Sequence, residues 1–498
     1  MNLNLDDMME RMGGAKKFQY EIIHPGDEGI KTRFADVGGQ IEAKVELMEI
    51  VDFLKNRQRY TDMGAKIPSG ALLSGPPGNG KTLLARAIAG EASVPFINTA
   101  GTNFIEKIGG LGPKRVRDIF KECKELAPCI LFIDEIDSIA SKRSGAQSAA
   151  GNPGGRGSEE ANNTLNQLLV EMDGLNSRDE IFVIGATNRD ESLDPAVTRP
   201  GRLDRKVYID DPTEIEREEV FRIHMAVIKL DPEVKEAYAA RLAACTPGFS
   251  GAKIASVCNE AAINAARFSG DSVKPKDFEI AMERMTAGLE RLTSSVTKEE
   301  VRLSAYYISA QALLSWALPN LTPVLKMSIA ARVNNPLGFK QFSPSRNLLY
   351  TKEALLDLIC RGLAGRASQL LFFDENTTQA QNDLKSISDI AYKMVADHGM
   401  GKSAPNLSFQ EVRSTERRVN LWSDKLQQEM DQEVKDIVQE QYEKAHSFLQ
   451  NNKELAKVLA EELYARKTLN EEDVQQIIDT HGPVVGSWTD DVSSESSN

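Results

Sequence analysis

The chemistry open to this chain is indicated first by residues 75–82, which read Gly-Pro-Pro-Gly-Asn-Gly-Lys-Thr and match the phosphate-binding pattern G-x-x-x-x-G-K-T. An apolar run precedes them and a helical pattern follows, so the motif has the strand–loop–helix context that it needs. The backbone N–H groups and the helix N-terminus would surround phosphates. Lys81 would reach the β- and γ-phosphates, and the Thr82 hydroxyl would hold Mg²⁺. The alternative is a turn rich in Gly and Pro that matches by chance.

Two carboxylates follow the apolar run at residues 129–133, where an ATPase with such a loop needs them. Asp134 would hold Mg²⁺ through water, and Glu135 would polarise the attacking water. A second apolar run, residues 181–186, leads to Asn188, which could sense the γ-phosphate or orient that water. The alternative for the carboxylates is an exposed strand end.

Three arginines then recur at a spacing of three, Arg199, Arg202 and Arg205. Unpaired arginines are costly to bury, and a guanidinium matches the charge of a phosphate being transferred. The alternative is a solvated basic turn.

The elements that would position these residues follow from hydrophobic patterning. Five short apolar runs are typical of buried parallel strands, and helical patterns separate them. They lie at residues 71–74, 96–99, 129–133, 181–186 and 206–209. We therefore expect an α/β domain with a parallel sheet wound with helices. The expected organisation is a linker or arm at 1–33, the large α/β domain at 34–211, a helical lid at 212–290, a mostly helical domain at 296–480 and an acidic disordered tail at 481–498.

Composition limits the partners and the compartment. The 498 residues include 60 basic and 73 acidic side chains, giving a net charge of −13, which disfavours general nucleic-acid binding. The five cysteines form no C-x-x-C pair and are typical of an intracellular reducing compartment. The chain contains no apolar run of 18 residues and no signal-peptide or other targeting pattern.

Together these motifs resemble the AAA+ ATPase superfamily. The resemblance implies ATP and Mg²⁺ as ligands, and a ring that is usually a hexamer. It implies that Arg199 and Arg202 are arginine fingers that reach the nucleotide of the next subunit. It also adds residues outside the motifs to the nucleotide site, although His224 could instead be a packed or surface histidine. The full expected nucleotide site is Val37, Gly38, Gly75, Pro76, Pro77, Gly78, Asn79, Gly80, Lys81, Thr82, Leu83, His224, Gly251 and Ala252.

Further stretches resemble one branch, the FtsH family of membrane-tethered AAA+ metalloproteases, over roughly residues 15–480. They include residues 50–55, 90–92, 165–174, 248–252, 288–290, 349–353, 382–384 and 398–400. The resemblance implies protein substrates, and homo- or hetero-hexamers of FtsH-type subunits. It also implies a place facing a membrane, in the cytoplasm or inside a mitochondrion or chloroplast. Family members carry N-terminal membrane anchors, so an anchor is either missing from this sequence, supplied by a partner, or not used.

This sequence departs from the peptidase motif of that family. The family needs H-E-x-x-H, in which two histidines bind Zn²⁺ and the glutamate is the general base. Tyr307 and Gln311 stand at the histidine positions, and Ile308 stands at the glutamate position. Asp383 matches the family's third zinc ligand but cannot hold a catalytic zinc alone. We therefore expect a peptidase-like domain without zinc and without peptidase activity.

This sequence also departs from the family in the loop that grips substrate in the central pore, because Ile108 replaces an aromatic residue. Isoleucine lacks the broad flat face of an aromatic ring, which puts efficient threading of polypeptide in doubt.

Three functions remain open. The first is an ATP-hydrolysing motor, acting as an unfoldase or in assembly, without its own proteolysis. The second is a non-catalytic, ATP-binding structural subunit of a hetero-oligomeric FtsH-type complex. The third is an active ATP-dependent zinc metalloprotease. The catalytic residues of the first would be Lys81, Asp134, Glu135, Asn188, Arg199 and Arg202.

Overall fold

The computed structural model forms two compact units, residues 1–282 and residues 283–498. The described residues are 20–25, 32–64, 68–105, 110–141, 155–175, 180–232, 234, 237–268, 270–289, 291, 296–332, 335–343, 349–409 and 423–481. Ile108, on which the pore-loop prediction rests, lies outside them, as does the tail expected at 481–498 except for its first residue, His481, which is helical. None of the helices among the described residues is long and apolar enough to cross a membrane.

The first unit is built on a six-stranded sheet with the order β1-β3-β4-β5-β2-β6. Its strands are β1 (Glu21–Ile23), β2 (Gly70–Ser74), β3 (Phe96–Ala100), β4 (Cys129–Asp134), β5 (Ile181–Thr187) and β6 (Arg205–Tyr208). The five predicted strands are confirmed as a parallel set. The prediction of a linker or arm over residues 1–33 does not hold for β1, because β1 pairs antiparallel with β3 at the sheet edge.

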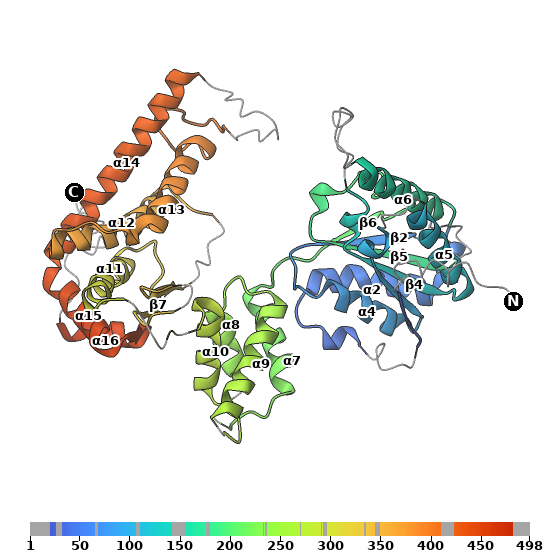
Figure 1. Ribbon diagram of the computed structural model, residues 1–498, viewed down its shortest axis with the longest axis horizontal. Coiled ribbons are helices and arrows are strands. Elements are labelled where there is room, and N and C mark those ends of the chain that lie inside the picture. The colour runs from blue at the N-terminus through green and yellow to red at the C-terminus, as the bar shows by residue number, and fades with distance from the viewer. Residues whose placement is uncertain are drawn as a thin grey trace. The chain divides into compact units, whose positions relative to one another are not determined.

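Helices cover both faces of this sheet (Figure 1). On one face, Leu47 of α2 (Ile41–Lys55) and Ile88 of α4 (Lys81–Ala92) share a core with Phe132. On the other, Phe120 of α5 (Leu111–Glu125) and Leu168 of α6 (Gly155–Asp173) share a core with the next strand residue along, Leu131. This alternation along β4 is what a strand buried on both faces requires. Shorter helices in this part are η2 (Phe34–Asp36), α3 (Arg57–Asp62), η3 (Gly101–Phe104), η4 (Ile136–Ser138) and η6 (Asp190–Ser192).

A helical part follows the sheet in the same unit. It contains α7 (Glu214–Ala226), α8 (Ala237–Cys245), α9 (Gly251–Arg267) and α10 (Pro275–Ala287), in which the division between the units falls. Thr213 and Glu216 form a capping box that starts α7. Phe221, Leu242, Val257 and Phe278 contribute to a core of its own.

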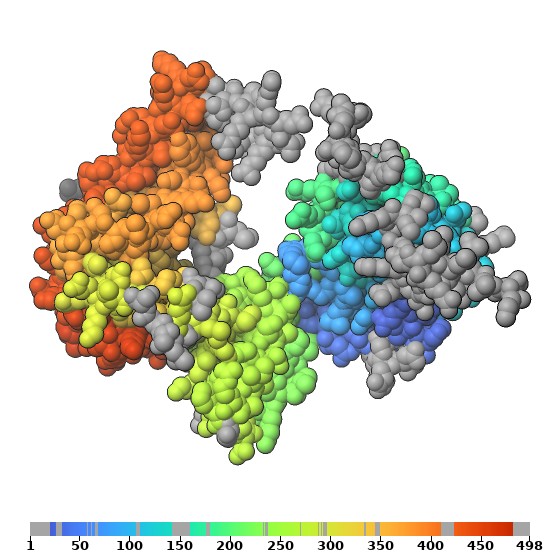
Figure 2. All heavy atoms as spheres, viewed as in Figure 1, coloured from blue at the N-terminus to red at the C-terminus, as the bar shows by residue number. Residues whose placement is uncertain are grey.

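The second unit is mostly helical, as predicted. Its helices are α11 (Lys298–Ala317), α12 (Lys352–Phe373), η7 (Thr378–Ala380), α13 (Gln381–Tyr392), the π-helix η8 (Lys393–Asp397), α14 (Asp424–Asn451), α15 (Lys453–Arg466) and α16 (Glu471–His481). It also holds a sheet that the sequence did not predict, with the order β8-β7-β9, made of β7 (Val324–Ser328), β8 (Phe339–Phe342) and β9 (Thr468–Asn470). The orange and red residues of α12 and α14 pack side by side (Figure 2).

Helix α11 is the central element of this second unit. A capping box of Thr297 and Glu300 starts it, and every residue from Ser304 to Ser315 is buried. The helix contacts α12 and α15 along its length. A helix that is buried on nearly all sides gains its stability from packing rather than from an exposed polar face.

Candidate functional site

The predicted phosphate-binding loop joins β2 to α4 in the first unit. Its first residue, Gly75, has φ of 150°, and a Cβ there would lie 1.9 Å from the carbonyl oxygen of Ile209. Gly78 and Gly80 also have positive φ, at 85° and 81°. The glycines therefore let the loop turn back over the strand ends with its backbone close to the sheet.

A cavity of about 530 Å³ opens above this loop, within the size range of small-molecule sites. Its lining includes the predicted residues Val37, Gly38, Pro77, Gly78, Asn79, Gly80, Lys81, Thr82, Leu83, Asp134, Glu135, Asn188, His224, Gly251 and Ala252. Gly75, Pro76, Arg199 and Arg202 are not part of that lining. The segment Asp36 to Gly38, which the family resemblance places against the adenine, lines the cavity as well, and the structure adds three lining residues that the sequence interpretation missed, Val220, Ile223 and Ala255. Val220 precedes Ile223 by three residues and His224 by four, a helical spacing that could have indicated Val220 and Ile223 but not Ala255.

Lys81 is held at the base of the cavity by three oxygen atoms. Its Nζ donates to the carbonyl oxygens of Gly75 at 2.7 Å and Pro76 at 2.9 Å, and to Oδ1 of Asn188 at 2.7 Å. Burial lowers the pKa of Lys81, and the charges of Asp134 and Asp137 oppose that shift. The predicted site residues Lys81 and Asn188 thus lie in direct contact, although Lys81 begins α4 and Asn188 follows β5.

Thr82 and Asp134, the two residues predicted to hold Mg²⁺, also lie in contact. Thr82 Oγ1 donates to Oδ2 of Asp134 at 2.9 Å, and the backbone N–H of Glu135 donates to Oδ1 of Asp134 at 2.9 Å. Glu135 has a left-handed backbone, with φ of 50°, and its side chain is exposed at the cavity. Such a backbone is uncommon for a residue with a side chain and recurs at functional sites.

The helical part closes the cavity from the other side. The N–H of Ala252, in the first turn of α9, donates to the carbonyl oxygen of Gly78 at 2.9 Å. The N–H groups of Gly39 and Ile41 donate to Glu219 and Glu216 of α7, at 3.0 and 3.2 Å. Half-buried His224 lines the same cavity, and burial lowers its pKa, so the imidazole is mostly neutral at pH 7.

The two arginines predicted as fingers differ in their surroundings. Arg202 Nε and Nη2 donate to the two carboxylate oxygens of Asp173, at 2.7 and 2.6 Å, and Nη1 donates to the carbonyl oxygen of Ala196. Arg199 is exposed. Their action on a neighbouring subunit stays a prediction.

The cavity fits ATP with Mg²⁺. It combines a loop of backbone N–H groups, a lysine, a hydroxyl beside a carboxylate, and an apolar wall from Val37 and the lid helices. The buried Oδ1 of Asn79 adds a polar atom without a hydrogen-bond partner among the described residues.

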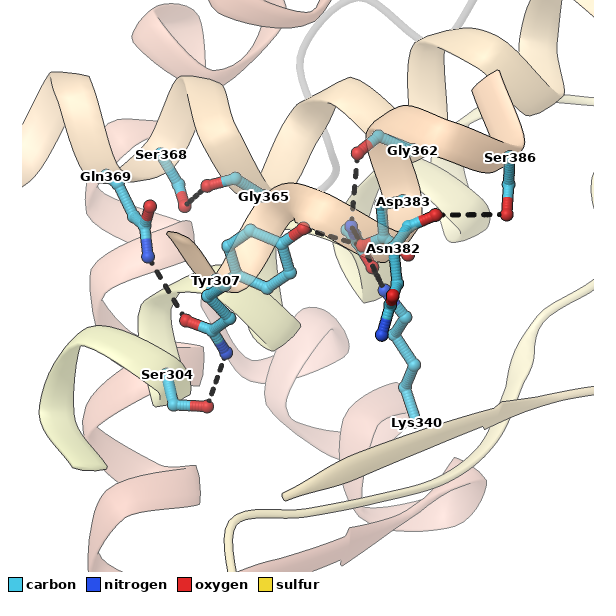
Figure 3. A network of polar contacts seen from close by, with 12 residues as sticks. Ser304, Tyr307, Lys340, Gly362, Gly365, Ser368, Gln369, Asn382, Asp383 and Ser386 are labelled. Atoms are coloured by element: carbon cyan, nitrogen blue, oxygen red, sulfur yellow. Dashed lines mark hydrogen bonds and ion pairs between the residues drawn. The ribbon is translucent and has the colours of Figure 1, made fainter. Parts of the chain in front are cut away.

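The residues at the expected peptidase motif form a different network in the second unit (Figure 3). Tyr307, Ile308 and Gln311 of α11 are buried. Oδ2 of Asp383, on α13, accepts three hydrogen bonds: from the Tyr307 hydroxyl at 2.6 Å, from Gln311 Nε2 at 2.9 Å and from Lys340 Nζ at 2.7 Å. Lys340 Nζ also donates to Oε1 of Gln311.

This donor set does not fit a catalytic zinc ion, which takes imidazole, thiolate or carboxylate ligands. Burial raises the pKa of the Tyr307 phenol far above neutral pH, aided by the Asp383 charge, so the phenol keeps its proton. Gln311 offers an amide, and Ile308 offers no group that moves a proton. Among the described residues, no group of three or more His, Cys, Asp or Glu is placed to hold a metal ion.

The sequence interpretation missed Lys340. It lies 29 residues from Gln311 and 43 residues from Asp383 along the chain, and it belongs to a strand that was not predicted. No spacing pattern in the sequence connects these residues.

Comparison with known families matches three parts of the chain. Residues 71–211 match the ATPase family associated with various cellular activities (AAA), and residues 239–280 match the AAA+ lid domain. Residues 294–477 match peptidase family M41. These ranges include the phosphate-binding loop, helix α9 of the helical part, and the residues Tyr307 and Asp383 of the second unit.

Individual relatives match across nearly the whole chain. The mouse "Mitochondrial inner membrane m-AAA protease component AFG3L1" is 45% identical over 451 residues, 90% of this chain and 56% of the relative. "ATP-dependent zinc metalloprotease FtsH 1" of Salinibacter ruber is 43% identical, covering 89% and 64%. "ATP-dependent zinc metalloprotease FTSH 3, mitochondrial" of Arabidopsis thaliana is 44% identical, covering 90% and 54%. The chain thus spans only 54–64% of the length of these relatives.

Proposed function

Because this chain is a homologue of the FtsH-family AAA+ ATP-dependent zinc metalloproteases, we propose that it is an ATP-hydrolysing subunit of a ring-forming motor. The proposed motor acts on protein substrates, in unfolding or assembly, and does not cleave them. One observation carries the proposal: a single cavity collects Lys81, Thr82, Asp134, Glu135 and Asn188.

Each of these residues has a proposed role. The loop N–H groups and Lys81 hold the phosphates, and Thr82 with Asp134 holds Mg²⁺. The exposed carboxylate of Glu135 orients and polarises the attacking water, and Asn188 senses the γ-phosphate beside Lys81. Bound Mg²⁺ would supply charge stabilisation to the phosphates.

The proposed absence of proteolysis rests on the network around Asp383. A phenol that keeps its proton, an amide and one carboxylate are a poor zinc set, and isoleucine replaces the general base. The relatives are active proteases by name, so this part of the proposal needs its own test.

The test uses the full chain, purified and assayed for ATP turnover, casein cleavage and bound zinc. We expect Mg²⁺-dependent ATP turnover, no casein cleavage and zinc far below one equivalent. Stoichiometric zinc together with casein cleavage that a chelator stops would refute the protease-dead proposal and leave the ATPase proposal standing.

Arg199 is exposed and does not line the cavity of its own subunit, so in a ring it could reach the cavity of a neighbouring subunit. We propose that Arg199 acts on the nucleotide of the next subunit. Arg199→Ala should lower ATP turnover by at least about tenfold, since arginine fingers contribute more than this, with nucleotide affinity unchanged. Arg205→Ala is the matched control, because Arg205 is an exposed arginine of the same stretch that pairs with Glu49 at 3.6 Å. Equal turnover in the two variants would exclude Arg199 as a finger.

A second candidate function is a non-catalytic, ATP-binding subunit of a mixed FtsH-type ring. Ile108 favours it, because an aliphatic pore residue grips polypeptide less well than an aromatic one. This chain would then bind ATP without turning it over alone. We also propose a membrane-facing location, in the cytoplasm or within an organelle, with any anchor supplied by a partner subunit or by a further segment of the protein. Native mass measurement of the purified particle would identify the ring partners.

A further inference from the structure

Lys340 brings a positive charge into the middle of the former peptidase motif. It lies on β8, the edge strand of the small sheet, and its side chain extends toward α11 and α13 (Figure 3). Its Nζ pairs with Asp383 at 2.7 Å and lies 5.4 Å from the centre of the Tyr307 ring. The ammonium therefore contacts the side chains at all three positions where the family resemblance implies zinc ligands.

The contacts around this ammonium are complementary. Gln311 uses both ends of its amide, since Oε1 accepts from Lys340 while Nε2 donates to Asp383 and, at 3.2 Å, to the carbonyl oxygen of Gly362. Asp383 accepts from all three neighbours through the same oxygen. In each of these contacts a hydrogen-bond donor faces an acceptor, which is the condition for a stable buried network.

The Lys340 ammonium and the Asp383 carboxylate carry opposite charges. Burial acts to raise the pKa of Asp383, but the Lys340 charge and the hydrogen bonds from Lys340, Tyr307 and Gln311 outweigh it and hold the pKa below its ordinary value. Asp383 is therefore an anion at neutral pH. Burial lowers the pKa of Lys340, and Asp383 opposes that shift. Arg361 of α12 is a further cation that interacts electrostatically with Lys340 and with Asp383, and its guanidinium lies 4.0 Å from the centre of the Phe342 ring.

We infer that the Lys340 ammonium is a built-in cation, which takes the place of a metal ion among residues 307, 311 and 383. It compensates the Asp383 carboxylate, occupies the lone pairs of Gln311 and Asp383, and repels a second cation. The inference rests on the proposed loss of the zinc site and goes beyond it. The network has not only lost ligands; it pairs Asp383 with a cation of its own, which makes this unit independent of metal.

The direct test restores the histidines in the full chain. Tyr307→His with Gln311→His provides two imidazoles beside Asp383, and zinc affinity is then measured with and without Lys340→Met. Methionine keeps most of the length of the unbranched side chain and removes its charge. We expect the variant that keeps Lys340 to bind zinc at least about tenfold more weakly, because the ammonium repels the zinc ion. A tenfold change in affinity is the same free energy as a shift of about one pKa unit. Lys385→Met is the matched control, because Lys385 is an exposed lysine of the same unit. Equal zinc affinities with and without Lys340 would overturn the inference.

A second measurement keeps the inference testable if the histidine variants do not fold. The three tryptophans of the sequence are Trp316, Trp422 and Trp488, so none lies within residues 1–282. Trp316 packs against the core of the second unit, so its fluorescence reports the unfolding of that unit. Lys340→Met should lower this melting temperature by several degrees, and adding Asp383→Asn should restore much of the loss. A chelator should leave the wild-type melting temperature unchanged. An unshifted Lys340→Met transition would overturn the inference.

These outcomes separate the inference from the proposed function. Zinc bound stoichiometrically by the wild-type chain would refute the loss of the zinc site. Wild-type protein without zinc, combined with a Lys340→Met variant that behaves as wild type in both experiments, would refute only the role of Lys340.

Discussion

Replacing Glu135 by glutamine should leave ATP binding intact and lower ATP turnover by about a hundredfold or more, the contribution of a positioned general base. The glutamine keeps the size of the side chain and its place at the cavity but cannot polarise water as a carboxylate does. The measurement is steady-state phosphate release by the full chain, paired with equilibrium nucleotide binding.

Glu125→Gln is the control for this change. Glu125 is an exposed glutamate at the end of α5, pairs with Lys121 at 3.9 Å and lies outside the cavity lining. Turnover by Glu125→Gln should match wild type. If Glu135→Gln also matched wild type, the assignment of Glu135 would be wrong. If the wild-type chain bound ATP but showed no turnover alone, the structural-subunit function would be favoured.

Gly75→Ala should unfold the phosphate-binding loop and destabilise the first unit by at least about 3 kcal/mol, in the range that a backbone clash produces. The added Cβ, whose position the backbone of residue 75 fixes, would lie 1.9 Å from the backbone carbonyl oxygen of Ile209. Neither can rotate away, so the strand ends of β2 and β6 must separate. Calorimetric unfolding without nucleotide measures the loss, and ATP binding should fall with it.

Gly80→Ala provides a matched comparison from the same loop. Gly80 also has a positive φ, 81°, but a Cβ there would meet no atom closer than 4.0 Å. Gly80→Ala should lower the free energy of unfolding only by the cost of a left-handed backbone at alanine, about 1–2 kcal/mol. Equal losses for the two variants would mean that the contact with Ile209 is not the reason Gly75 is required.

The sequence predicted the parts of the first unit that local patterns encode. The five parallel strands are apolar runs that alternate with helices, and the residues at their carboxyl ends meet at one edge because parallel strands point the same way. Lys81, Asp134 and Asn188 could therefore be placed together from the sequence alone. Strand β1 could not be predicted, because three residues within a polar stretch are stabilised by pairing with β3 rather than by their own pattern.

The second unit was less predictable, for a physical reason. Tyr307 and Gln311 were found by their departure from a motif, whereas Lys340 joins them only through the fold. A lysine on a short strand is ordinarily a solvated residue, and its burial beside Asp383 depends on how the small sheet packs against α11 and α13. Long-range pairing of this kind leaves no periodicity in the sequence.

The burial of α11 has an evolutionary consequence. The helix that carries positions 307 and 311 is also the rod on which α12 and α15 pack, so selection for folding alone preserves it. Substitutions there are filtered by volume and hydrogen bonding, not by chemistry, and a lineage that no longer needs peptide-bond cleavage can exchange ligands for other groups that fill the same space. If the proposed loss of proteolysis holds, the domain persists for its packing, and its similarity to peptidase family M41 records ancestry.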